Sequence, residues 1–192
     1  MSIVLHPSLS ARDRLIETAR VLFLRHGVPH IGINRVIDEA NVARMTLYNH
    51  FPSKDALVAA VYEQEAELRR QSILTAQAAH DTPVAKVSAL FDIALELARE
   101  KGFRGCAFVN LAIETAAADG SLHALAKAHK EWIRANVLDC LPSEMFADPA
   151  TLARQVVVLW DGGIVGAYVT QSVTPIKAAR DAAQALMRAA AS

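Results

Sequence analysis

Apolar residues recur at helical spacing along most of the chain. In the first segment Leu15, Ala19, Leu22 and Phe23 fall on one face of a helix, because a period near 3.6 residues brings such positions together whereas a strand would alternate. Gly and Pro are sparse and stand mainly between the periodic segments. The pattern predicts an all-α fold. The longer predicted helices cover residues 10–26, 53–79, 83–100, 121–140, 150–171 and 175–190.

Residues 33–50 predict two short helices joined by a tight turn. Val36, Ile37 and Ala40 share one face of the first helix. Asn41 follows it, and Asn tolerates the left-handed backbone conformation that a sharp turn between helices requires. This arrangement is typical of a helix-turn-helix.

The second short helix, residues 44–50, has almost nothing to bury. Leu47 is its one strongly apolar side chain, with Tyr48 beside it, and the remaining residues are largely hydrogen-bonding. Packing alone therefore gives this helix little stability, so its polar face indicates another use. A second helix that enters the DNA major groove explains the pattern.

A specific motif runs through the segment from residue 41 to residue 58. It reads Thr46-Leu47-Tyr48, then His50-Phe51 and Pro52-Ser53-Lys54, with Leu57 after it. With this motif the segment resembles the signature of the TetR family of bacterial transcriptional repressors, and the resemblance covers about residues 10–60. It implies a three-helix DNA-binding domain at residues 1–56 and a helical ligand-binding and dimerisation domain at residues 57–192. It also implies a homodimer that binds a palindromic DNA operator.

Candidate DNA-binding residues lie on the second short helix and close to it. Lys54 stands near a helix N-terminus, where its charge opposes the helix dipole, and a phosphate bound there would resolve the conflict. Arg12 is either a contact to the DNA backbone or an ordinary surface charge. Phosphate contacts are expected from Thr46, Tyr48 and Lys54, and base contacts from Arg44, Met45 and Asn49. The full predicted set is Arg12, Asn34, Arg35, Arg44, Met45, Thr46, Tyr48, Asn49, His50 and Lys54.

Two departures from the family pattern concern the turn and the helix that follows it. The usual Gly-Val-Ser is here Asn41-Val42-Ala43, and Met45 stands where many members have Gly. Ala43 cannot cap the second helix as Ser would, a loss of about 1 kcal/mol. The departures leave the fold prediction unchanged and make the base preference harder to predict.

Composition and charge indicate a globular chain without an overall basic signature. Hydrophobic residues make up 53% and charged residues 21% of the 192 residues, and the formal net charge is +0, which argues against disorder. Through residue 60 there are seven basic and five acidic side chains, a weak excess that alone would indicate only a solvated face. Two cysteines do not make a disulfide framework, and no signal-peptide pattern is visible. We expect a cytoplasmic protein.

The last two predicted helices are rich in apolar and small residues. Residues 152–169 are apolar on nearly all faces, so they must be covered on all sides. The segment is short for a membrane span and carries Asp161 in its middle, which argues against one. The cover is either an intramolecular core or a partner subunit, and the resemblance implies a dimer built as a four-helix bundle. The predicted interface residues are Gly162, Gly163, Gly166, Ala167, Ala179, Ala183 and Leu186.

No catalytic or cofactor motif is visible. The chain has no Gly-rich phosphate loop and no HExxH, and His123 and His129 are not spaced as zinc ligands, so we expect no enzyme activity, no cofactor and no metal. The resemblance implies a pocket for a small-molecule effector that the sequence does not identify. The alternatives are a small-molecule-binding enzyme or carrier, and a DNA-binding protein without an effector. Candidate pocket residues, each more often ordinary core, are Phe91, Phe103, Cys106, Phe108, Asn110, His129, Trp132 and Trp160.

Cys106 has two interpretations. It is either a small buried apolar residue or a thiol that senses oxidants, because Arg104 lies two residues away and a helix is predicted to begin nearby. Cys140 has no such basic neighbour in the sequence and is expected to react more slowly.

Overall fold

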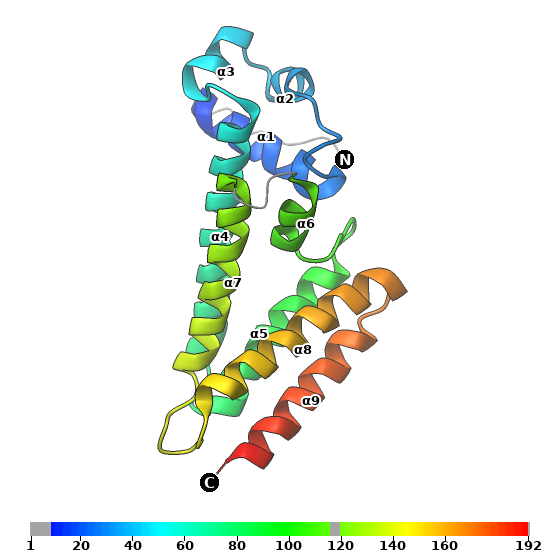
Figure 1. Cartoon of the computed structure of the whole chain (residues 1–192). Helices are drawn as coiled ribbons and strands as arrows, with labels where there is room; N and C mark the ends of the chain where they lie inside the picture. Colours follow the sequence, from blue (N-terminus) through cyan, green and yellow to red (C-terminus); the bar gives the residue numbers. More distant parts are fainter. Residues whose placement is uncertain (1–8, 116–119, 192) are drawn as a thin grey trace. The chain divides into compact units, whose positions relative to one another are not determined.

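The computed structural model describes residues 9–115 and 120–191, and its regular elements in these ranges are helices (Figure 1). This confirms the all-α prediction. The helices are α1 (Ala11–His26), α2 (Ile33–Ala40), α3 (Arg44–His50), α4 (Lys54–Ala78), α5 (Pro83–Arg99), α6 (Ala107–Glu114), α7 (Ser121–Asp139), α8 (Pro149–Thr170) and α9 (Thr174–Ala190).

The helix ends follow from local sequence signals. The Ser10 hydroxyl accepts the Asp13 N–H at 3.1 Å and so caps α1. Gly27, at φ 89°, ends the same helix, and its N–H donates to the Phe23 carbonyl. Asp148 caps α8 by accepting the Thr151 N–H, and hydrogen bonding with the Thr151 side chain, together with that backbone bond, holds the pKa of Asp148 below its ordinary value. Capping chemistry is local, which explains why sequence alone predicts these ends.

The chain forms two compact units, and the first joins the N-terminal segment up to Glu67 with Ala107–Lys127. It therefore contains α1, α2, α3 and α6 with the beginnings of α4 and α7. On α4, Tyr62 packs edge-on against Phe108 of α6, with ring centroids 5.6 Å apart. The sequence prediction divided the chain into two consecutive parts at residue 56, whereas this compact unit also includes α6.

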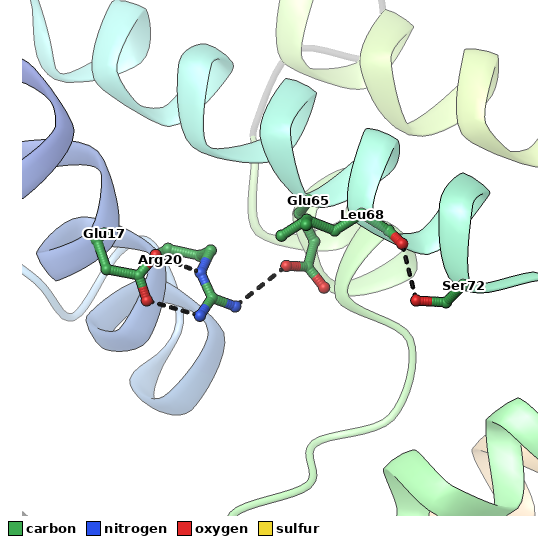
Figure 2. Close-up of polar contacts among 5 residues, drawn as sticks. All are labelled: Glu17, Arg20, Glu65, Leu68 and Ser72. Carbon is green, nitrogen blue, oxygen red and sulfur yellow. Dashed lines mark hydrogen bonds and ion pairs between the residues drawn. The ribbon is translucent and has the colours of Figure 1, made fainter.

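A charged cluster ties α1 to α4 inside the first unit (Figure 2). Arg20 donates to both carboxylate oxygens of Glu17, at 2.7 and 3.0 Å, and to Glu65 at 3.3 Å. The side chain of Glu65 is only 1% exposed, and a buried carboxylate needs such a partner. The hydrogen bonds to Glu17 raise the pKa of Arg20 above its ordinary value. The cluster joins the middle of α4 to the first helix.

The second compact unit comprises Leu68–Cys106 and Ala128–Ser192, and α8 and α9 pack side by side within it (Figure 1). Its core combines side chains of α5, α7, α8 and α9. At its edge Gln77 and Asn136 are buried and exchange two amide hydrogen bonds of 2.9 Å. This reciprocal pair satisfies both buried amides. Fully buried members of the core include Leu90, Phe91, Ile133, Val137, Ala153 and Val156.

Candidate DNA-binding interface

The turn between α2 and α3 and a buried apolar side chain fix the helix-turn-helix. Asn41 adopts φ 50° and ψ 58°, the left-handed conformation predicted for the turn. The next residue, Val42, donates its N–H to the Ile37 carbonyl at 3.3 Å. On α3, Leu47 is fully buried and is the buried residue of that helix in the described structure. One anchor side chain thus fixes a two-turn helix and leaves its other faces outward.

The outward face of α3 carries the predicted base-contacting residues. Met45 is 69% exposed, and Arg44 and Asn49 are exposed as well. The Arg44 guanidinium lies 5.9 Å from the centre of the Tyr48 ring, a cation–π contact that restrains a long side chain. Exposed donors on a rigid helix can reach base edges in a major groove. Thr46 is half-buried, and His50 is exposed.

Residues on α1 and α2 extend the same set. The Arg12 guanidinium lies over the Phe51 ring, 5.5 Å from its centre. Asn34 is exposed on the first turn of α2. Arg35 is paired with Glu39 at 2.8 Å, and such an exposed pair contributes about 0.3–0.5 kcal/mol on a helix. A phosphate would have to compete with that carboxylate for Arg35.

Lys54 has a structural partner that the sequence did not indicate. Its ammonium group donates to the Val28 carbonyl at 2.7 Å, and burial lowers the pKa of Lys54 below its ordinary value. It is the first residue of α4, and Ser53 caps that helix, its hydroxyl accepting the Ala56 N–H. An ammonium group has three donors, so the Val28 bond leaves two for a phosphate.

The predicted pocket residues fall in both compact units. Phe108 and Asn110 belong to the first unit, and the other six belong to the second. In the second unit, Arg70 lies over Trp132 with 5.5 Å to the ring centre, and Lys130 lies over Trp160 with 4.8 Å. Lys130 also pairs with Asp161.

Two buried groups of the second unit have unusual polar surroundings. His129 is only 4% exposed, and its burial, with help from Lys130, Arg70 and Arg69, lowers its pKa to about 3. The Trp160 Nε1 is buried without a hydrogen-bond partner among the described residues. A buried N–H donor of this kind favours an acceptor atom from outside the chain.

A hollow of about 300 Å³ opens at one end of α5 and α8. Phe103 is the one predicted pocket residue that lines it, within the part of the chain that the structure describes. One acidic and one basic residue, Glu100 and Lys101, also line the hollow.

Cys106 is a free, half-buried thiol that packs against the core of the second unit and directly precedes α6. No group of three side chains suited to a metal ion occurs in residues 9–115 and 120–191.

Two glycines of α8 pack against α9 of the same chain. A Cβ on Gly163 would lie 3.0 Å from the Ala179 Cβ, and one on Gly166 would lie 2.8 Å from the Pro175 Cβ. These two glycines therefore let α9 of the same chain approach closely, and their place in a contact between subunits stays a prediction. The predicted residues Ala167, Ala179 and Ala183 are likewise buried within the chain. Leu186 and Gly162 remain exposed.

A different stripe of α8 lacks cover. Val158, Gly162, Val165 and Val169 stand four, three and four residues apart, the spacing of a helix–helix seam. Val158 and Val169 are 70% and 72% exposed. The sequence predicted that α8 needs cover on all sides, whereas in the described chain its uncovered apolar surface lies on this face. By length and composition α8 is also apolar enough to cross a membrane, with 39% of its apolar window buried in the described chain. A core helix with one uncovered face meets the same criterion.

Two family models match the sequence of this chain. Residues 15–61, which hold α2, α3 and the turn between them, match the model of bacterial regulatory proteins of the tetR family. Residues 83–182 match the model of the C-terminal domain of LmrA/YxaF-like transcriptional regulators. Together they cover both the helix-turn-helix and most of the helical body.

Similar proteins agree with these matches. The chain is 41% identical over 76 residues to a probable acrEF/envCD operon repressor of Escherichia coli K12, across 38% of the chain and 34% of the repressor. It thus spans about a third of that relative. It is 26% identical over 170 residues to the HTH-type transcriptional regulator LmrA of Bacillus subtilis, across 86% of the chain and 90% of the relative.

Solved structures show the same fold over nearly the whole chain. A TetR-family regulator from Streptomyces coelicolor superposes with a TM-score of 0.88 at 29% identity, covering 94% of this chain and 95% of that one. A putative TetR regulator from Streptomyces avermitilis gives a TM-score of 0.75 at 26% identity, with 91% and 98% covered. With α3 presenting an exposed polar face beside the matched motif, the chain belongs to the TetR family of bacterial transcriptional regulators.

Proposed function

We propose that this regulator is a cytoplasmic homodimeric repressor that binds a palindromic operator and releases it when a small molecule binds its helical body. The observation that carries the proposal is α3, a two-turn helix in which Leu47 is buried, Thr46 is half-buried and the other side chains are exposed. In the proposed complex Arg44, Met45 and Asn49 read bases, and Thr46, Tyr48 and Lys54 bind phosphates. The relatives named as repressors support this direction of control.

The exposed stripe of α8 supports the dimer. Val158 and Val169 of this stripe are more than two-thirds exposed. Soluble monomers rarely expose a continuous apolar surface, and such surfaces often mark sites of protein–protein contact. A second copy of α8 would supply an identical stripe, and a two-fold axis makes such a surface self-complementary. The residue at the centre is Gly162, which permits close approach of the two helices.

The aromatic and cationic side chains of the second unit support an effector site. Trp160 offers a buried N–H donor without a partner among the described residues, and Lys130 and Arg70 place positive charge over aromatic rings. An effector with an acceptor atom near the Trp160 Nε1 would satisfy that donor. Binding in the second unit would act on α4, because Leu68–Ala78 of that helix belong to this unit while its start carries Lys54.

Selection of bound duplexes from a random DNA pool tests the proposal. The expected product is a palindrome with half-sites about one helical turn, or a multiple of a turn, apart. A ligand screen on the protein–DNA complex then seeks a compound that releases the DNA and is recovered unchanged. Chemical conversion of that compound would favour the enzyme alternative instead. Failure to enrich any sequence would contradict operator binding.

A further inference from the structure

Two hydrogen bonds converge on Val28, a buried residue in the connection between α1 and α2. Its N–H donates to the Glu114 carboxylate at 2.9 Å, and its carbonyl accepts from the Lys54 ammonium group at 2.7 Å. Glu114 is the last residue of α6, and Lys54 is the first residue of α4. All three residues lie in the first compact unit. Three separate elements therefore meet at one backbone position.

The two bonds hold the connection from both sides. The N–H belongs to the peptide group before the Val28 Cα and the carbonyl to the peptide group after it, so the pair fixes how the residue is oriented. Gly27, at φ 89°, precedes it, and Pro29 follows. Both bonds involve an ionised side chain, and such bonds are stronger than those between neutral groups.

We propose that Glu114 is a positioning residue for DNA binding: through the Val28 backbone it fixes the place of Lys54, and it makes the phosphate contact of Lys54 depend on α6. The inference rests on the proposed function, in which Lys54 binds a phosphate. A hydrogen bond of 2.9 Å weakens steeply when its atoms separate by an ångström. A shift of α6 therefore releases the Val28 connection and lowers operator affinity.

The test is a double-mutant cycle on operator binding, measured by fluorescence anisotropy with the selected duplex. Glu114→Leu keeps approximate size but removes the acceptor, whereas Glu114→Gln keeps an oxygen that accepts the Val28 N–H. We expect Glu114→Leu to weaken binding about twofold to tenfold per subunit, the effect of one lost hydrogen bond, and Glu114→Gln to bind like the wild type. Ile113→Ala, on the neighbouring residue that is 76% exposed, is the matched control and should also bind like the wild type.

The cycle with Lys54→Ala separates positioning from a general effect. If Glu114 acts through Lys54, Glu114→Leu causes no further loss in the Lys54→Ala background, because coupled residues are not additive. Additive losses, or wild-type binding by Glu114→Leu, overturn the proposal. Glu114→Ala, whose smaller side chain cannot clash, repeats the cycle if the Leu variant does not fold by circular dichroism. A wild-type protein that selects no operator would instead refute the proposed function, and the role of Glu114 with it.

Discussion

Gly162 offers a substitution that separates the dimer from the subunit fold. A Cβ at this position meets no atom within 4 Å in the described chain, so Gly162→Leu leaves the packing of the single subunit intact. Leu is also about 0.8 kcal/mol better than Gly inside a helix. In the subunit alone, the substitution should therefore be mildly stabilising.

In the proposed dimer the same change has the opposite sign. An added side chain in a close helix seam costs about 1–3 kcal/mol, and a two-fold interface contains the site twice, so dimerisation should lose about 2–6 kcal/mol. That raises the dimer dissociation constant about 30-fold to 10⁴-fold, at 1.4 kcal/mol per factor of ten.

Sedimentation at several concentrations, with thermal unfolding alongside, measures both effects. The expected result is a folded Gly162→Leu protein that sediments as a monomer where the wild type is a dimer. Gly163→Leu is the contrasting variant: its side chain meets Ala179 and Ile176 of the same chain, so it should unfold at a lower temperature. A Gly162→Leu protein that stays dimeric and melts higher than the wild type would refute the assignment of this face.

Other predictions concern the DNA contacts, the buried histidine and the thiols. Lys54→Ala should weaken binding to all DNA sequences alike and reduce the slope of log affinity against log salt concentration by about one unit. Asn49→Ala should instead change base preference by about 1–3 kcal/mol at one position of the site. A Lys54→Ala protein with altered base preference and an unchanged salt slope would contradict this. Because the pKa of His129 is lowered to about 3 in the fold and is near 6.5 in the unfolded chain, the histidine costs stability as pH falls from 6.5 toward 3. Between pH 7 and pH 5 the free energy of unfolding, measured in urea at fixed protein concentration, should fall by about 2 kcal/mol more for the wild type than for His129→Asn. Equal losses in the two proteins would show that His129 is not the source of the pH dependence. Burial raises the pKa of Cys140, so iodoacetamide should label Cys140 slowly at pH 7; slow labelling of Cys106 as well would leave only its structural interpretation.

The elements were predictable where their signals are local. Ser10 and Gly27 mark the two ends of α1 through hydrogen bonds that span four residues or fewer, and Asn41 marks the turn by its own backbone conformation. The outward face of α3 was predictable for a similar reason. In a short helix with one apolar residue, that residue packs inward and the polar residues on the other faces are left exposed.

The rest depends on contacts between distant segments. The spacing of Gly163 and Gly166 indicates a close helix approach but not that the nearby helix is α9 of the same chain, which the structure shows. The bonds from Glu114 and Lys54 to Val28 join residues 86 and 26 positions apart. No pattern along the sequence indicates them, because hydrogen bonds between segments so far apart leave no local signal.

The central claim is that two copies of the exposed α3 face bind one symmetric DNA site. Anisotropy titration of the selected palindrome, against a duplex with one half-site scrambled, measures this most directly at physiological salt. The expected result is two chains per palindrome, with binding at least about 10³-fold tighter than to unrelated duplex and strongly reduced by scrambling one half-site. Equal affinity for palindrome, scrambled and unrelated duplexes would contradict the account.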